Sequence, residues 1–182
     1  MSFATQAAKP SKADLIVPGS NIGNTFLGPN GWHYLDRLPL PPISEGHMSQ
    51  RDYLWISGKP PRVHSLYIHT TANAPLDAKP VDGETIDEIR ITSPEFRTGD
   101  GLKCGSTYAQ ILAVFPKIRP GDGRETGIYF DRARGIAFEF EGKPDGDSPC
   151  IAITVFPPGL PRLATRQQID DFIKYHPSLL TD

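Results

Sequence analysis

The sequence lacks long apolar runs, clustered basic charge and a secretion signal. No window holds the roughly 20 apolar residues that a membrane-spanning helix needs, and the residues after Met1 do not form the charged start and apolar core of a signal peptide. The 19 basic and 21 acidic residues give a net charge of −2, without the basic stripe that is typical of nucleic-acid binders. We therefore expect neither a membrane span nor a nucleic-acid partner.

Recognisable catalytic and metal-binding motifs are missing too. The chain contains no Gly-x-Ser-x-Gly nucleophile elbow, and Gly19–Gly23 is not followed by the Lys-Ser or Lys-Thr that completes a phosphate loop. None of the five histidines has metal-ligand spacing, and the Asp-Gly clusters lack the regular acidic spacing of a calcium loop. The sequence therefore predicts no catalytic residue, no metal and no cofactor.

Cysteine is scarce, because Cys104 and Cys150 are the only two. Cys104 precedes a predicted helix and Cys150 begins a predicted strand, an arrangement that could bring the two thiols together. A disulfide would suit an exported domain, whereas two reduced, buried thiols would act as small apolar side chains. Connectivity is not fixed by sequence alone, so both interpretations stay open.

The composition favours many short strands over long helices, with 38% hydrophobic residues, 17 glycines and 19 prolines. Apolar residues at helical spacing predict a helix over 107–115, with Ser106 as its N-cap, and a shorter helix over 32–38. Glu139 and Glu141 are expected on an exposed acidic face of the sheet. Alternating or apolar runs predict strands at 51–57, 63–70, 84–92, 126–133, 135–141 and 150–156.

Two similar motifs indicate an internal repeat. Gly19–Thr25 (GSNIGNT) and Gly101–Thr107 (GLKCGST) share their glycine spacing, and each precedes an apolar stretch and then three predicted strands. An internal repeat determines the fold. We therefore predict an α+β protein of two repeated units, each a short helix packed on an antiparallel β-sheet, with the two sheets joined through 84–92.

Four segments result from this interpretation. Residues 1–14 are polar and small, which predicts a disordered tail. Residues 15–92 and 93–160 are the two helix-plus-sheet units. Residues 161–182 come after a stiff proline-rich linker and begin with a capping-box pattern, which predicts a C-terminal helix.

With the repeat laid out, the chain resembles tandem modules of the β-lactamase-inhibitor-protein-like and BamE (SmpA)-like families. The resemblance spans about residues 15–157 and rests on the residues shared by the two motifs, namely Gly19, Gly23, Thr25, Gly101, Gly105 and Thr107. It implies an exported bacterial protein with a binding, inhibitory or assembly role. The turns at 58–62 and 132–135 carry no recognisable version of the loop by which such inhibitors enter their targets, so inhibition of a β-lactamase is not implied.

Aromatic side chains crowd the first half of the chain. Tyr and Trp bury large areas yet keep a polar group, and they are enriched at binding surfaces for that reason. We name Tyr53, Trp55 and Tyr67 as the candidate binding residues. The alternative interpretation is that Trp32 and Trp55 fill the core of the first unit.

The resemblance and the missing motifs together predict a non-enzymatic binding module whose partner is another protein. An inhibitor or a toxin-neutralising immunity protein is one concrete version. The expected location is the periplasm or the exterior, after removal of a signal peptide, although a complete chain would be cytoplasmic. Two alternatives stay open: a hydrolase whose active site is assembled only in three dimensions, and a structural component of the cell envelope.

Overall fold

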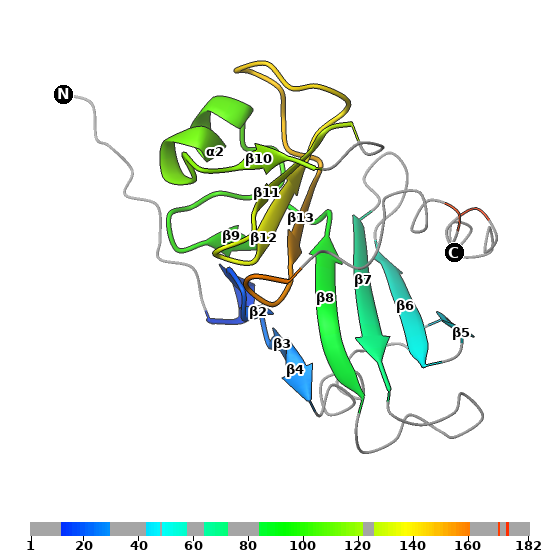
Figure 1. The fold of residues 1–182 in the computed structure, drawn as a ribbon. Coiled ribbons are helices and arrows are strands. Elements are labelled where there is room, and N and C mark those ends of the chain that lie inside the picture. Colours follow the sequence, from blue (N-terminus) through cyan, green and yellow to red (C-terminus); the bar gives the residue numbers. More distant parts are fainter. Residues whose placement is uncertain are drawn as a thin grey trace.

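The computed structural model describes residues 12–29, 43–47, 49–57, 64–72, 84–121 and 126–160, together with Asp171 and Lys174. Between residues 12 and 160, the described secondary structure consists of β-strands in two sheets, a single α-helix and a short 3-10 helix, η1 (Lys12–Asp14). In Figure 1 the α-helix lies at one end of the larger sheet, and the long strands lie toward the other end.

The larger sheet has nine strands, and its neighbouring strands pair antiparallel throughout. A two-residue strand forms one edge and a five-residue strand the other. In spatial order the strands are β10 (Arg119–Pro120), β11 (Ile128–Asp131), β12 (Ile136–Glu139), β13 (Ala152–Val155), β8 (Thr85–Ile91), β7 (His64–Thr71), β6 (Gln50–Ser57) and β5 (Ile43–His47), with β4 (Gly28–Pro29) beside the start of β8.

The smaller sheet is built from four short strands near the start and the middle of the chain. Its order is β3 (Thr25–Phe26), β2 (Asn21–Ile22), β1 (Leu15–Val17) and β9 (Arg97–Thr98). Only β1 and β9 run parallel. The Gly19 amide donates to the Gly135 carbonyl at 3.1 Å, which ties this sheet to the turn between β11 and β12.

The six predicted strands are present, each within two residues of its predicted limits. The short turn at 132–135 joins β11 and β12 into the predicted antiparallel hairpin. The exposed position predicted for Glu139 is wrong, because all four residues of β12 are buried and Glu139 has no exposed area, whereas Glu141, just after the strand, is exposed as predicted. The alternation of apolar and other residues therefore separated the two faces of this strand correctly, but both faces are buried.

The helix α2 (Tyr108–Val114) begins one residue later than predicted. Its N-cap is Thr107 and not Ser106: the Thr107 hydroxyl accepts the Gln110 amide at 3.3 Å, and the Gln110 side chain accepts the Thr107 amide at 2.9 Å. This capping box satisfies two otherwise unpaired amides. The apolar face of the helix packs on the larger sheet through aromatic pairs, such as Phe115 with Phe138 at 5.2 Å between ring centres.

The predicted α+β fold of two repeated helix-plus-sheet units is wrong. The structure is mostly β-sheet, and the larger sheet is not divided, because residues 89–91 of β8 pair with β7 on one side and with β13 on the other. The prediction that the two halves join through 84–92 is thereby confirmed, but as one continuous sheet.

The glycine motifs that suggested a repeat lie in different surroundings. Gly23 forms the turn between β2 and β3, where an added Cβ would lie 2.5 Å from the Ala13 carbonyl oxygen. Gly105 lies in the loop before α2, where an added Cβ would meet no atom within 4 Å. Both glycines have positive φ, and this conformation fits a strand turn as well as the start of a helix. The shared spacing therefore did not specify whether a strand or a helix comes next.

The other predicted segments are described only in part. The helix predicted over 32–38 and the tail at 1–11 lie outside the described residues, as does the predicted C-terminal helix over 161–182, apart from Asp171 and Lys174. Residues 12–14, which were predicted to belong to the disordered tail, form η1. The boundary predicted at 92/93 lies directly after β8, the strand that both halves of the larger sheet share.

Candidate functional site

The strands β6, β7 and β8 present two chemically different faces. Residues that pair across antiparallel strands point to the same side, so Tyr53, Ile68 and Ile89 share one face, which is mostly apolar. The opposite face carries a row of mostly buried polar side chains that runs across the sheet. We call these residues the polar row: Asp52, Tyr67, His69, Glu88, Arg90 and Glu139.

Asp52 is the point at which the polar row reaches solvent. Its carboxylate oxygen Oδ1 accepts the Tyr67 hydroxyl at 2.5 Å and lies 2.6 Å from His69 Nδ1. The Asp52 side chain is 33% exposed, while the His69 side chain is only 6% exposed. The arrangement orients the imidazole through a carboxylate, as general-base histidines are oriented in hydrolases.

His69 keeps one ring nitrogen without a partner. Its Nε2 atom is buried and has no hydrogen-bond partner. Burial is the largest influence on the pKa of His69 and lowers it. The hydrogen bond to Asp52 and the charges of Asp52, Glu88 and Asp87 together outweigh burial, so the pKa is raised above 6.5.

Arg90 and Glu139 form a buried, two-point ion pair in the polar row. Arg90 Nε donates to Glu139 Oε1 and Nη2 donates to Oε2, both at 2.9 Å, and the Thr154 hydroxyl lies 3.5 Å from Oε1. The pair connects β8 to β12 across β13. An Arg–carboxylate pair with two hydrogen bonds is strong and directional. We therefore interpret this pair as a structural link between β8 and β12.

The three predicted binding residues do not share one face. Tyr53 and Trp55 are brought together on the mostly apolar face, with ring centres 6.1 Å apart, whereas Tyr67 lies on the opposite face. Both tyrosines are buried, and Trp55 is partly buried. The Tyr53 hydroxyl donates to Glu84 Oε2 at 2.8 Å, and burial followed by the Glu84 hydrogen bond raises the pKa of Tyr53 to about 12. A binding role for these residues stays a prediction.

Cys104 and Cys150 are brought together, as free thiols, in the interior. The Cys150 carbonyl accepts the Gly105 amide at 2.7 Å, and the Cys150 amide donates to the Ser106 carbonyl at 2.8 Å. A hydrogen bond with the Cys104 thiol, followed by burial, raises the pKa of Cys150 well above its usual value. Their pairing as a disulfide stays a prediction.

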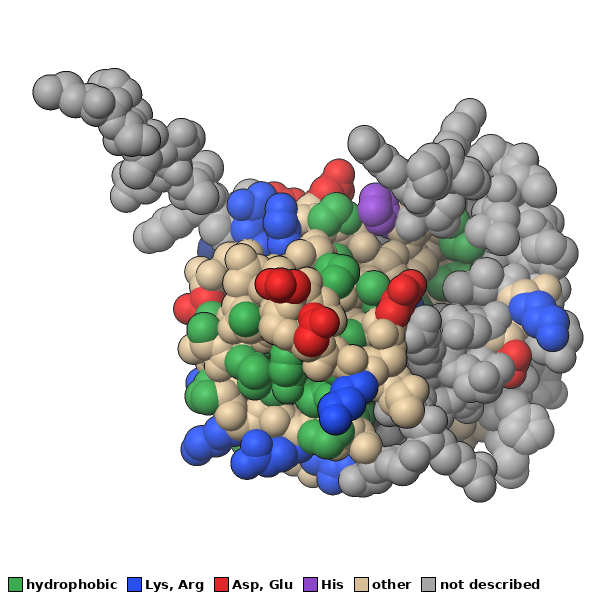
Figure 2. All heavy atoms as spheres, turned by 90° about the horizontal axis from the view of Figure 1, so that it is seen from above, with side chains coloured by type: hydrophobic (Ala, Val, Ile, Leu, Met, Phe, Trp, Pro, Cys, Tyr) green, Lys and Arg blue, Asp and Glu red, His purple; other side chains and the backbone are tan. Residues whose placement is uncertain are grey.

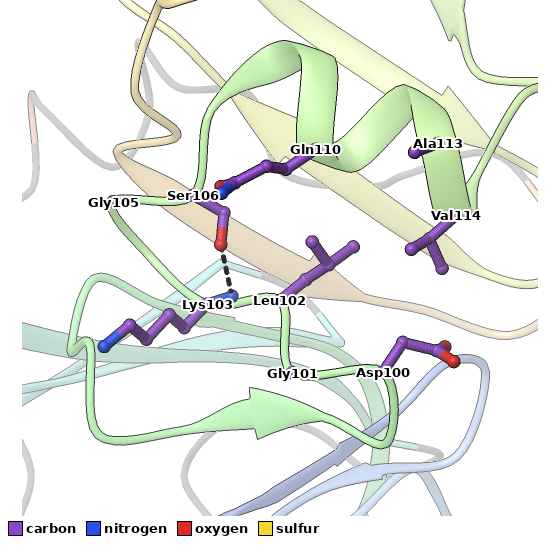
Figure 3. Close-up of a pocket in the computed structure, with 9 residues that line it drawn as sticks. All are labelled: Asp100, Gly101, Leu102, Lys103, Gly105, Ser106, Gln110, Ala113 and Val114. Atoms are coloured by element: carbon purple, nitrogen blue, oxygen red, sulfur yellow. Dashed lines mark hydrogen bonds between the residues drawn. The ribbon is translucent and has the colours of Figure 1, made fainter. Parts of the chain in front are cut away.

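An open groove runs beside α2, between the helix and the loop that precedes it (Figure 3). We call it the α2 groove. It has a volume of about 540 Å³, and Leu102, Ala113 and Val114 supply apolar lining. Figure 3 shows Leu102 on the loop side and Val114 on the helix side. Its ionisable side chains are Asp100 and Lys103, so the groove offers shape and mixed polarity but no set of catalytic groups.

Bonds within the loop fix one wall of the α2 groove. Thr98 accepts the Leu102 amide through its hydroxyl at 3.1 Å, and its own amide donates to the Leu102 carbonyl at 2.8 Å. The Ser106 hydroxyl accepts the Lys103 amide at 3.0 Å, as the dashed line in Figure 3 marks. Ser106 therefore shapes the groove wall, although sequence suggested it as a helix cap.

Sequence reasoning missed both the polar row and the α2 groove. One signal for the polar row was present: Ser65, Tyr67 and His69 alternate with Leu66 and Ile68 along a strand with strong apolar character. No local signal marks the groove, because its two walls meet only through tertiary packing. The described residues contain no group of three or more His, Cys, Asp or Glu side chains that could hold a metal. None of the helices in this described part of the chain has the length and the apolar character of a membrane span.

Comparisons with known proteins do not identify a family. No protein-family model matches the chain, and no curated protein matches it. A solved structure that it resembles is that of the uncharacterized protein yfeY from Escherichia coli, at 13% sequence identity and a TM-score of 0.37, covering 82% of this chain and 99% of that one. The comparisons give no family evidence for the β-lactamase-inhibitor-protein-like or BamE-like resemblance.

Proposed function

We propose that this protein is a non-enzymatic binding module, active outside the cytoplasm, that receives a segment of a partner protein in the α2 groove. The observation that carries the proposal is the groove itself: an open groove lined by apolar side chains such as Leu102 and Val114 and by polar ones such as Lys103 and Gln110. Protein interfaces likewise combine apolar and polar groups. An inhibitor or an immunity protein is one form that such a module could take.

The walls of the α2 groove are held before any partner arrives. The capping box fixes the start of the helix, and the Thr98 and Ser106 bonds fix the loop. A preformed site loses less conformational entropy on binding than a flexible one.

Figure 2, which views the molecule from the α2 side of Figure 1, shows apolar side chains gathered between acidic groups and a rim of Lys and Arg on the described part of this face.

Site-specific photo-crosslinking tests this proposal. The full chain would carry p-benzoylphenylalanine at Ala113, in the groove, or at Phe26, which is 40% exposed in the smaller sheet and serves as the matched control. We expect one dominant adduct from the native host at Ala113 and none at Phe26. With the identified partner purified, Val114→Asp is expected to weaken binding about 10-fold or more, because it places a charge against an apolar contact. Equal cross-linking at both positions, or unchanged affinity in the Val114 variant, would contradict the proposal.

A hydrolase is the second candidate function, and one observation favours it. His69 is oriented by Asp52 and keeps Nε2 unpartnered, which is the arrangement of a general base that lacks its substrate-side contact. Against it, His69 is hydrogen-bonded to Asp52 and, among the described residues, to no serine or cysteine. The binding module is therefore the conclusion that the geometry supports better.

A further inference from the structure

A second hollow lies beyond the C-terminal end of α2 and is rich in positive charge. It has a volume of about 310 Å³ and is lined by residues from the turn after α2, from β10 and from the hairpin of β11 and β12. Its basic residues are Lys117, Arg119 and Arg132, and all three are exposed. We call it the cationic hollow.

Asp131 is the acidic residue among the described lining residues, and it faces Arg134, which lies outside the lining. Asp131 is buried, with 7% of its surface exposed. Its Oδ1 accepts the Arg134 amide at 3.1 Å and its Oδ2 lies 3.7 Å from Arg134 Nε, so its charge is balanced by an arginine outside the lining. The cationic hollow therefore carries positive charge from Lys117 and Arg119 that Asp131 does not balance, on a protein whose net charge is −2.

An aromatic ring helps to position one of the cations. The Arg132 guanidinium carbon lies 5.9 Å from the centre of the Phe130 ring. That ring is itself held edge-to-face against Phe156, with centres 6.2 Å apart. A cation over an aromatic face is attracted to it, so Arg132 is less free than an ordinary surface arginine.

The surroundings of the cationic hollow fit carboxylates on an extended chain better than one compact phosphate. Phosphate sites commonly use several backbone amides. Here the amides of Gly121, Arg134 and Gly135 are already bonded, to the carbonyls of Ile128 and Asp131. The hollow offers instead the separate side-chain cations of Lys117 and Arg119, which suit successive acidic side chains.

Arg134 places the cationic hollow next to the α2 groove. Its Nη1 atom donates to the carbonyl of Val114, a groove residue, at 3.5 Å, while its Nε faces Asp131 of the hollow. Its guanidinium also lies 4.8 Å from the centre of the Phe115 ring. One side chain therefore contacts residues that line both depressions.

We infer that the partner is a protein with an acidic stretch, whose carboxylates occupy the cationic hollow while an adjoining apolar part lies in the α2 groove. The inference rests on the proposed function and adds to it the chemistry of the partner. Electrostatic complementarity of this kind sets specificity and association rate more than affinity, so each carboxylate contributes modestly.

The test uses the full chain and a fluorescein-labelled hexaglutamate peptide, with binding measured by fluorescence anisotropy. We expect hexaglutamate to bind weakly and hexaglutamine not to bind. The double substitution Lys117→Glu and Arg119→Glu is expected to weaken hexaglutamate binding about 10-fold or more. The matched control, Lys12→Glu with Lys143→Glu, changes the net charge equally at positions outside the hollow. It is expected to weaken hexaglutamate binding by less than about 3-fold, because distant charges are screened and act weakly.

Absence of hexaglutamate binding would overturn the inference, and two further results would do the same. One is an equal loss of binding in the two double variants, which would make the attraction a property of net charge alone. The other is displacement of the peptide by inorganic phosphate at a concentration below the peptide's own dissociation constant, which would indicate a compact anion site. Hexaglutamate binding does not require the natural partner, so its failure leaves the Ala113 cross-linking result standing. Unchanged partner affinity in the Val114→Asp variant, in contrast, defeats the proposed function.

Discussion

At the scale of single residues, the Asp52–His69 pair couples stability to pH. The pKa of His69 is raised above 6.5 in the folded protein, because Asp52, Glu88 and Asp87 favour the protonated ring more than burial opposes it. A raised folded-state pKa stabilises the fold below the unfolded pKa, and this contribution is lost as pH rises through the folded value. The free energy of unfolding therefore contains a term from His69 that is complete below about pH 6.5 and fades at higher pH.

The first prediction concerns this histidine. His69→Gln is expected to lower the free energy of unfolding by about 1–3 kcal/mol at acidic pH, through loss of a hydrogen bond to a charged group, and by less at alkaline pH. Urea denaturation between about pH 5.5 and 9 measures the difference. His64→Gln, on the same strand and the opposite face, controls for removing a histidine. A loss of unfolding free energy in His69→Gln that stays constant across this pH range would contradict the prediction.

The same variant separates the two candidate functions. If the protein were a hydrolase that uses His69 as a base, the wild type would cleave a chromogenic ester and His69→Gln would abolish that activity. As a binding module, the protein should show no such activity in either form, and cross-linking at Ala113 should survive the substitution. The histidine would then be a structural residue of the polar row.

At the scale of elements, the hairpin of β11 and β12 joins the two sheets through a crowded turn. Gly135 has φ of +70°, and a Cβ added there would collide with the Phe156 carbonyl oxygen and approach Gly19 Cα at 2.9 Å. The Gly135 carbonyl also accepts the Gly19 amide, and its amide donates to Asp131. The turn therefore needs both the positive φ and the missing side chain.

The second prediction compares two glycines that share the conformation but not the crowding. Gly142 has φ of +76° with nothing within 4 Å of an added Cβ, so Gly142→Ala should cost about 1–2 kcal/mol from backbone strain alone. Gly135→Ala should cost clearly more, about 4 kcal/mol or above, because backbone must also move. Thermal and urea unfolding of the two variants measure the two losses of stability. Similar losses in both variants would contradict the prediction, because they would show that the turn at Gly135 relaxes to accept a side chain.

At the scale of the whole molecule, the two halves of the larger sheet share one core. A single core cluster includes Ile68 and Ile89 from one end of the larger sheet and Phe138 and Ile153 from the other. The Arg90–Glu139 pair crosses the same junction. Loss of one partner from a buried ion pair typically costs about 3–5 kcal/mol, so the two halves are linked by both apolar packing and charge.

The third prediction is a single unfolding transition. We expect calorimetry to give equal calorimetric and van't Hoff enthalpies, and fragments 1–92 and 93–182 to be unfolded when produced separately, because each loses a sheet neighbour along β8 or β13. Circular dichroism and proteolysis of the fragments provide the check. A fragment that folds by itself would restore the idea of two independent units.

Local sequence patterns were sufficient to place the secondary-structure elements named below. Alternation and apolar runs predicted six strands within two residues, a turn at 132–135 and the helix at 107–115, because side-chain periodicity and capping are local properties. Tertiary structure alone decided that β8 joins both halves into one sheet, that Glu139 and Tyr67 are buried, and that a groove and a cationic hollow lie beside α2. Strand pairing and burial depend on contacts between residues far apart in the chain, and a repeated glycine spacing fixes only the local backbone conformation.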